Sequence, residues 1–143
     1  MDLRTHPALL HLLIIGTVIA AVAGLRRISQ IQAVAPLVAG GIYSIEYGSA
    51  FGIVKILALT PGAVHVRLFQ QSYWDRPNYV DLSTLTLGPH DDPAGFSIGH
   101  MPITRQAFEN SVPRLIAQVS VEEEELEGFR LWEEAEGGLF NSL

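Results

Sequence analysis

Hydrophobic residues are spread unevenly along the chain, and the longest apolar run lies near the N-terminus. Residues 8–25 are apolar except for His11 and Thr17, and the pair Arg26-Arg27 follows directly. A helix rises about 1.5 Å per residue, so a helix over this run is about 27 Å long, close to the roughly 30 Å of a bilayer core. The run also lacks the polar face of a helix on a globular surface. The pattern therefore predicts a single membrane-spanning helix.

A secretory signal peptide is the alternative interpretation of this run. Arg4 precedes it, and Ala21-Val22-Ala23 fits the small-residue pattern of a cleavage site. Arg26 and Arg27 favour retention instead, because positive charge beside an apolar run is held on the cytoplasmic side. We therefore expect a single-pass protein of the bacterial inner membrane, with the lipid bilayer around its helix and its C-terminal domain facing the cytoplasm.

Small residues recur within the run at Gly16, Ala20 and Gly24. Every fourth position lies on one stripe of a helix, and small side chains there let another helix approach closely. We expect this stripe to pack against integral membrane subunits, although such residues are also common in membrane helices generally. His11 is a candidate contact for a pigment or haem, or else its ring lies among the headgroups.

Alternating polar and apolar positions replace the long run after Gly41, as expected of strands. Pro61-Gly62 predicts a type II turn between two of them. Four or five short strands within about fifty residues fit a small barrel that curls closed and so hides its edges. Thr104 is placed to cap a short helix ending at Asn110. The predicted strands cover residues 43–47, 51–59, 64–68, 80–87, 96–100 and 115–121, and the predicted turn covers residues 60–63.

A second helix is predicted from a capping box formed by Ser120 and Glu123, and it runs to about Glu136. Its apolar stripe is Leu126, Phe129 and Trp132. The fold class expected is thus a single N-terminal transmembrane helix plus a small α+β domain, an SH3-like antiparallel β-barrel with a C-terminal helix. The expected divisions are 1–27 for tail and helix, 28–40 for an interfacial linker and 41–143 for the domain.

Charge separates the two parts of the chain. From Gly41 onward there are six Lys and Arg residues against fourteen Asp and Glu residues, a balance of −8. An acidic domain is repelled by phosphate backbones, so nucleic acid is excluded as an expected partner. Cysteine is absent from the sequence and decides nothing about the compartment.

Aromatic residues are concentrated after the predicted hairpin, at Tyr73, Trp74 and Tyr79, with Arg76 among them. Protein interfaces favour these residue types, so these four residues are the candidate partner-binding site. The alternative is that the aromatic rings plug the ends of the barrel themselves.

Catalytic chemistry has weaker support. His90, Asp91, Asp92 and His100 carry groups that can hold a divalent metal, but no recognised ligand spacing is present and the first three are also turn formers. The sequence contains no phosphate loop, dinucleotide fingerprint or Gly-x-Ser-x-Gly elbow. We therefore expect no catalytic residues, no bound metal and no cofactor beyond the pigment contact considered for His11.

Several stretches resemble small uncharacterised bacterial proteins with an SH3-like β-barrel: FGIVKIL, VHVRLF, LTLG, GFSIGHMPIT and EEELEGFRLWEEAEGG. The resemblance covers most of the chain after Phe51 and implies a small soluble module, but it implies no activity.

These patterns together predict a non-enzymatic accessory subunit of a bacterial membrane complex of photosynthetic or respiratory type. Its helix would pack against integral subunits, and its domain would brace one membrane face. The alternatives are a membrane-tethered SH3-like protein-binding module and a small metal-dependent enzyme using His90, Asp92 and His100.

Overall fold

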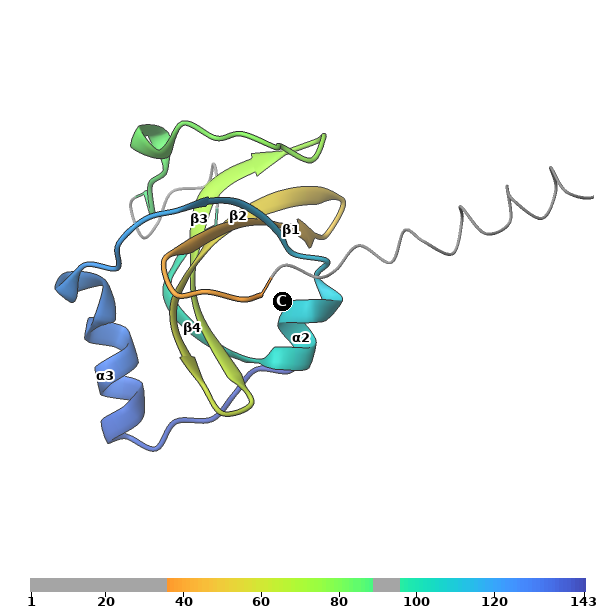
Figure 1. The fold of residues 1–143 in the computed structure, drawn as a ribbon. Coiled ribbons are helices and arrows are strands. Elements are labelled where there is room, and N and C mark those ends of the chain that lie inside the picture. The colour runs from red at the N-terminus through yellow and green to blue at the C-terminus, as the bar shows by residue number, and fades with distance from the viewer. Residues whose placement is uncertain (1–35, 89–95) are drawn as a thin grey trace, which may run out of the picture. The chain divides into compact units, whose positions relative to one another are not determined.

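The computed structural model describes residues 36–88 and 96–143. Short turns join the first three strands (Figure 1). A longer connection, which contains a 3₁₀ helix, separates the third strand from the fourth, and a short helix lies between the fourth and the fifth. The elements along the chain are β1 (Gly41–Tyr47), β2 (Ala50–Thr60), β3 (Ala63–Tyr73), η1 (Leu82–Thr84), β4 (Ile98–Thr104), α2 (Arg105–Asn110), β5 (Arg114–Gln118), η2 (Glu123–Leu126) and α3 (Glu127–Glu134).

The expected fold class is wrong. The strands form one five-stranded antiparallel sheet in the order β4-β3-β2-β1-β5, accompanied by a small C-terminal helix. Within residues 36–88 and 96–143, no helix is long and apolar enough to cross a membrane. The run at 8–25, on which the membrane helix was predicted, lies outside the described residues.

The sheet does not close into the expected barrel, because β4 and β5 lie at its opposite ends. The C-terminal segment occupies the outer edge of β4 instead. The Phe140 N–H donates to the Pro102 carbonyl, the Thr104 N–H donates to the Phe140 carbonyl, and Phe140 forms a parallel bridge with Ile103. Backbone groups that would pair with β5 in a closed barrel are therefore already used.

The hairpin of β2 and β3 is the longest paired unit of the sheet. Thr60 pairs with Ala63, and Gly62 has a φ of +76°. That angle suits the third position of a type II turn and confirms the turn predicted from Pro61-Gly62. The register shifts between Gly52 and Val54, and again between Ile56 and Ala58. Such bulges increase local twist, and both strands curve strongly around the core (Figure 1).

Side chains alternate between the two faces of the sheet. One face forms a buried apolar core that is closed by α2, whose Phe108 ring meets Tyr43 edge to face at 5.7 Å. Thr104 caps α2 by accepting a hydrogen bond from the Ala107 N–H, as predicted. The core contains Tyr43, Ile45, Val54, Ile56, Val64, Val66, Leu68, Met101, Ile103 and Phe108.

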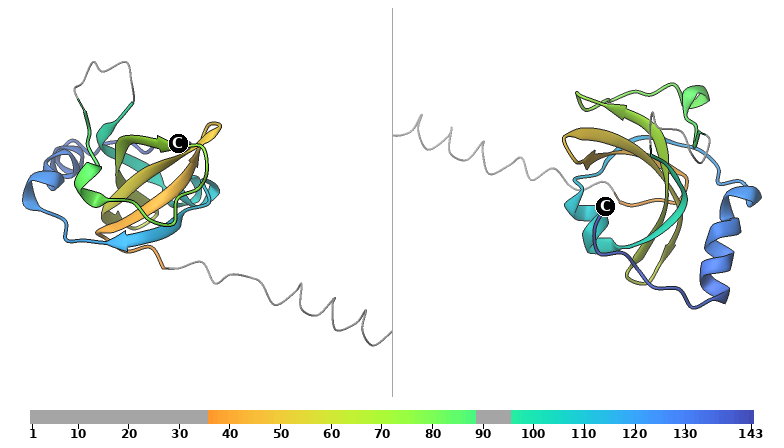
Figure 2. Two further views of the ribbon diagram at one scale, coloured as in Figure 1. Left: turned by 90° about the horizontal axis from the view of Figure 1, so that it is seen from above. Right: turned by 180° about the vertical axis from the view of Figure 1, so that it is seen from behind.

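The opposite face of β3 and β4 is covered by η2 and α3. The views in Figures 1 and 2 place α2 and α3 on opposite sides of the sheet. The alternation that sends Val64 and Val66 into the core sends His65 and Arg67 to the side of α3. The outer face therefore carries ionisable groups beneath η2 and α3, and a second apolar cluster that includes Ile42, Ile53 and Val80 lies apart from the main core.

Candidate functional site

Six residues predicted as site residues lie outside the described ranges. They belong to the N-terminal run and to the segment between η1 and β4, so their roles stay predictions. They are His11, Gly16, Ala20, Gly24, His90 and Asp92.

His100, the remaining metal candidate, lies on β4 and directs its Nε2 atom at His65 Nδ1, 3.1 Å away. Across the described part of the chain, no group of three or more His, Cys, Asp or Glu side chains is arranged to hold a metal ion. The structure therefore gives His100 a histidine neighbour and no further ligand within its described residues.

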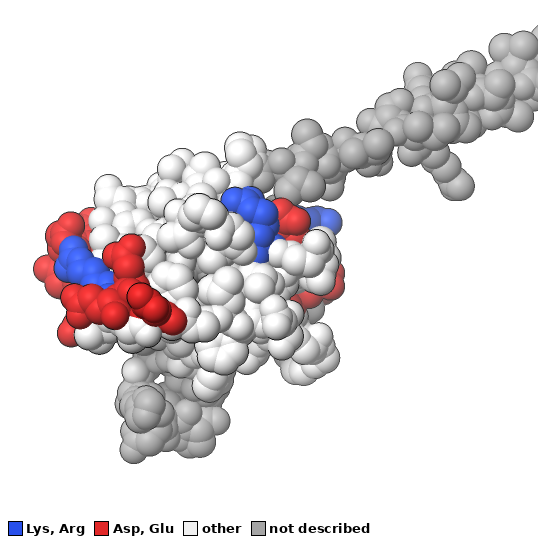
Figure 3. All heavy atoms as spheres, turned by 90° about the horizontal axis from the view of Figure 1, so that it is seen from below, with Lys and Arg blue, Asp and Glu red and all other residues white. Residues whose placement is uncertain are grey.

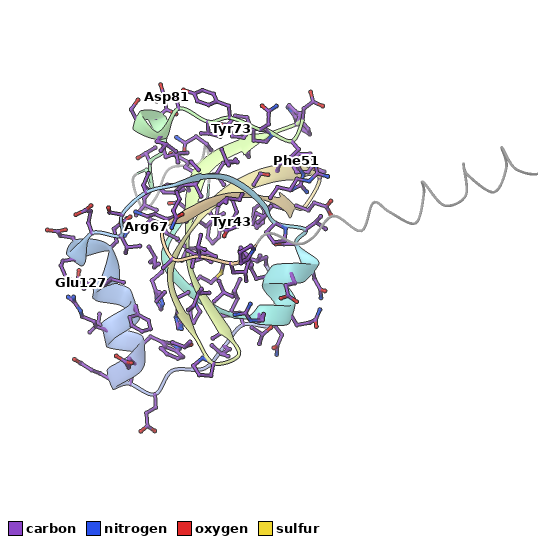
Figure 4. All side chains as sticks on the ribbon, viewed as in Figure 1. Tyr43, Phe51, Arg67, Tyr73, Asp81 and Glu127 are labelled. Atoms are coloured by element: carbon purple, nitrogen blue, oxygen red, sulfur yellow. The ribbon has the colours of Figure 1, made fainter. Side chains whose placement is uncertain are left out.

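The four predicted partner-binding residues separate into two kinds. Trp74 and Tyr79 are 84% and 76% exposed, among the most exposed large hydrophobic side chains in the described structure. Tyr73 instead packs against a second buried cluster that contains Ile53 and Val80, and Figure 4 shows it on the same side of the domain as Asp81. The aromatic loop, defined here as residues 74–79, thus presents two rings to solvent.

Arg76 fastens the aromatic loop to the sheet. Its Nη1 atom donates to the carbonyl oxygens of Ser44 and Val112 at 3.2 and 2.8 Å, and its Nη2 atom lies 3.4 Å from Glu46 Oε1. Its guanidinium carbon lies 4.6 Å from the centre of the Phe51 ring. All of these partners belong to the chain itself, so Arg76 is a positioning residue for the loop and is not free to contact a partner.

The surroundings of the aromatic loop are acidic. Asp75 and Asp81 are both exposed. The hydroxyl and backbone N–H of Ser83 donate to Asp81, and these hydrogen bonds lower the pKa of its carboxyl group. The Asp81 carboxyl group is therefore anionic at neutral pH. Arg76 adds no free positive charge, because Glu46 pairs with it.

Acidic side chains also dominate the far end of the domain, at η2 and α3 (Figure 3). Exposed glutamates there outnumber the single arginine of α3, Arg130, which pairs with Glu123. Most cations of the described residues are engaged in the same way, since five of the six Lys and Arg residues have a carboxylate oxygen within 4 Å. The described surface therefore offers much more unpaired negative than positive charge.

A buried ionic cluster, which sequence reasoning missed, attaches η2 to the sheet. Lys55 Nζ donates to Glu125 Oε2 at 2.5 Å and to the Ser120 carbonyl at 2.6 Å. Arg67 Nη1 lies 2.9 Å from the other oxygen of Glu125. Burial raises the pKa of Glu125, but the hydrogen bond from Lys55 and the two positive charges outweigh it, so that its pKa lies below the usual value.

A second cluster that sequence reasoning missed is the histidine pair, His65 and His100. The two rings are nearly parallel, with centroids 5.3 Å apart, and the His65 side chain is fully buried. His65 Nε2 lies 3.1 Å from Thr60 Oγ1, so both of its ring nitrogens have a partner. The rings of Phe129 and Trp132 approach the His65 ring at 4.7 and 4.5 Å, at steep angles.

Helix α3 lies directly against the histidine pair. A Cβ atom added at Gly128 would come within 2.5 Å of the His100 Cβ, so glycine is required for this close approach. Burial, together with the neighbouring His100 ring, lowers the pKa of His65 to about 4. Burial lowers the pKa of His100 as well. Both imidazoles are therefore neutral at pH 7.

Comparisons with known proteins give no family or relative for the chain. No family model, no curated protein and no solved structure matches the chain.

Proposed function

We propose that the chain is a non-enzymatic protein-binding module that serves as an accessory subunit of a larger assembly and contacts its partner through the aromatic loop. The observation that carries the proposal is the exposure of Trp74 and Tyr79 on a loop held in place by Arg76. Large rigid aromatic side chains are the commonest binding hot spots in protein interfaces. A loop that is already held in one conformation loses less entropy when it binds.

Charge indicates what kind of partner segment fits. Trp74 and Tyr79 lie among two exposed acidic residues, Asp75 and Asp81, and the one cation of the loop is already paired. Aromatic faces attract Arg and Lys side chains, and nearby carboxylates strengthen that attraction. A segment of the partner that carries Arg or Lys residues is therefore the best match for this surface.

The membrane host, the cytoplasmic orientation and the contact of His11 with a pigment stay predictions. They rest on sequence patterns before residue 28, outside the described ranges. The aromatic loop supports a role in protein binding whichever assembly contains the chain.

The test compares two alanine variants of the full chain in its native cells. One carries Trp74→Ala and Tyr79→Ala, and the matched control carries Leu131→Ala, which removes a side chain that is 60% exposed on α3. Purification in mild conditions should recover a stoichiometric partner with the parent and the control, and should lose it with the double variant. Equal recovery by all three proteins would exclude the aromatic loop as the contact, provided that circular dichroism shows each of them folded.

Partner chemistry is tested separately on the purified chain with arginine-rich and glutamate-rich peptides of equal length. Quenching of tryptophan fluorescence by the arginine-rich peptide alone, weakened by salt and lost in Trp74→Phe, would support the basic partner. Quenching by both peptides, or by neither, would contradict it.

A further inference from the structure

Helix α3 is held to the sheet through ionisable side chains on the outer face of β3 and β4. We propose that the histidine pair is an acid-sensitive contact whose protonation releases α3 from the sheet, while the Glu125 cluster keeps η2 attached. The proposal is independent of the partner of the aromatic loop.

The hydrogen bonds of the pair set how many protons it can accept. With both rings neutral, one proton lies between His65 Nδ1 and His100 Nε2, and Thr60 Oγ1 completes the bonding of His65. A first additional proton can reside on His100, because its Nε2–H then donates to His65 Nδ1. A second places N–H groups on both facing atoms, 3.1 Å apart, which removes the bond and sets two positive rings against each other.

Among the described residues, no carboxylate is hydrogen-bonded to the rings that would carry these positive charges. The rings packed on His65 are those of Phe129 and Trp132, and the backbone at Gly128 lies against His100. Burying an unpaired charge in such a site is costly. Release of α3 would place both imidazoles in water and would relieve this cost.

Charged groups on every neighbouring element are engaged elsewhere or face solvent. Lys55 of β2 and Arg67 of β3 both pair with Glu125 of η2. The charged residues of α3 are all exposed, and they are Glu127, Arg130, Glu133 and Glu134. The described structure therefore shows no carboxylate hydrogen-bonded to either imidazole.

The direction of the pH effect follows from the lowered pKa of each histidine. Released, the pair titrates near the ordinary histidine pKa of about 6.5, whereas His65 in the docked state has a pKa of about 4. The free energy that favours α3 bound to the sheet is therefore fully present above about pH 6.5, and it decreases as the pH falls toward 4. The pKa of Glu125 lies below its usual value, so its ion pairs outlast the histidine contact on acidification.

The chain carries its own reporter of this event. It contains two tryptophans, Trp74 and Trp132, and Trp132 is the one packed on His65. In the full chain with Trp74→Phe, fluorescence reports on Trp132 alone. We expect its emission to move to longer wavelength on acidification, with a midpoint between about pH 6.5 and 4. The β-sheet signal in far-ultraviolet circular dichroism should stay unchanged over the same range.

Variants of the pair decide whether the histidines cause the transition. In the same background, His65→Gln should abolish the fluorescence transition between about pH 6.5 and 4, and the control His90→Gln should retain it. Histidine ¹⁵N chemical shifts of the parent provide a measurement that needs no substitution at the pair, and the His65 and His100 signals should titrate together with the Trp132 emission.

Three outcomes would overturn the proposal. The Trp132 emission could stay constant down to about pH 4 while the imidazoles titrate. The transition could persist in His65→Gln. The fluorescence change could coincide with loss of the β-sheet signal, which would indicate global unfolding in place of helix release.

Discussion

Replacing Arg76 by alanine should destabilise the domain and free the aromatic loop. The side chain donates to two backbone carbonyls, of Ser44 and Val112, and its guanidinium lies over the Phe51 ring. Each hydrogen bond contributes about 1 kcal/mol and the ring contact about 0.5–1 kcal/mol. The pair with Glu46, a residue whose side chain is 55% exposed, adds little. The expected loss in the free energy of unfolding is therefore about 3 kcal/mol.

Urea denaturation followed by circular dichroism measures this loss. With a slope of about 1–3 kcal/mol per molar urea, the midpoint should fall by roughly 1–3 M. Arg76→Lys keeps the charge but loses the planar fork, so its midpoint should fall by a smaller amount. Arg105→Ala is the matched control, because Arg105 forms an exposed pair with Glu109. Its midpoint should move by less than about 0.5 M.

A result that gives Arg76→Ala and Arg105→Ala the same midpoint would refute the assignment of Arg76 as a positioning residue. The hydrogen bonds to Ser44 and Val112 would then contribute no net stability, and the preorganisation argued for the aromatic loop would lose its basis.

Three further predictions concern the outer face of the sheet. Glu125→Gln leaves the buried Lys55 ammonium without its carboxylate, so the free energy of unfolding in urea at pH 7 should fall by about 3 kcal/mol; a loss under about 1 kcal/mol would count against the cluster. Gly128→Ala raises helix propensity, but the new Cβ atom collides with His100, so the thermal midpoint should fall. At an unobstructed helix position the same substitution would raise the thermal midpoint. The pKa of His65 is lowered to about 4, so the free energy of unfolding of the parent should fall by up to about 3 kcal/mol between about pH 6.5 and 4, and His65→Gln should not show that fall. Urea midpoints that fall equally in parent and variant across this range would contradict the prediction.

Local sequence patterns predicted local structure. The Pro61-Gly62 turn and the Thr104 cap depend on residues that lie next to each other in the chain, and the structure has both. The capping box predicted at Ser120 and Glu123 lies two residues later, at Glu122 and Glu125. The Ser120 carbonyl accepts a hydrogen bond from Lys55, a residue 65 positions earlier, which no local pattern reveals.

Long-range arrangements could not be predicted in this way. The alternation of polar and apolar residues places His65 on the other face from Val64 and Val66, but it leaves open what covers the outer face. The histidine pair joins residues 35 positions apart, and α3 adds a third segment. The apolar stripe predicted through Phe129 and Trp132 was the one available signal, since such a stripe requires a surface to cover.

Arg76 shows the limit of reasoning from residue type. An arginine among aromatic residues is typical of a binding surface, and the sequence therefore suggested a contact with a partner. The structure uses the same guanidinium inside the chain, where it meets carbonyls of β1 and of the turn before β5. Trp74 and Tyr79 keep the exposure that the prediction required.

The segment that occupies the outer edge of β4 also protects the protein from self-association. An unpaired strand edge is a template for strands of other chains and promotes aggregation. Phe140 satisfies backbone groups at Pro102 and Thr104, and the opposite edge strand, β5, is only five residues long. A chain shortened before Phe140 would expose the edge of β4, which is the longer of the two edge strands. It should therefore aggregate more readily as its concentration rises, even where its fold survives.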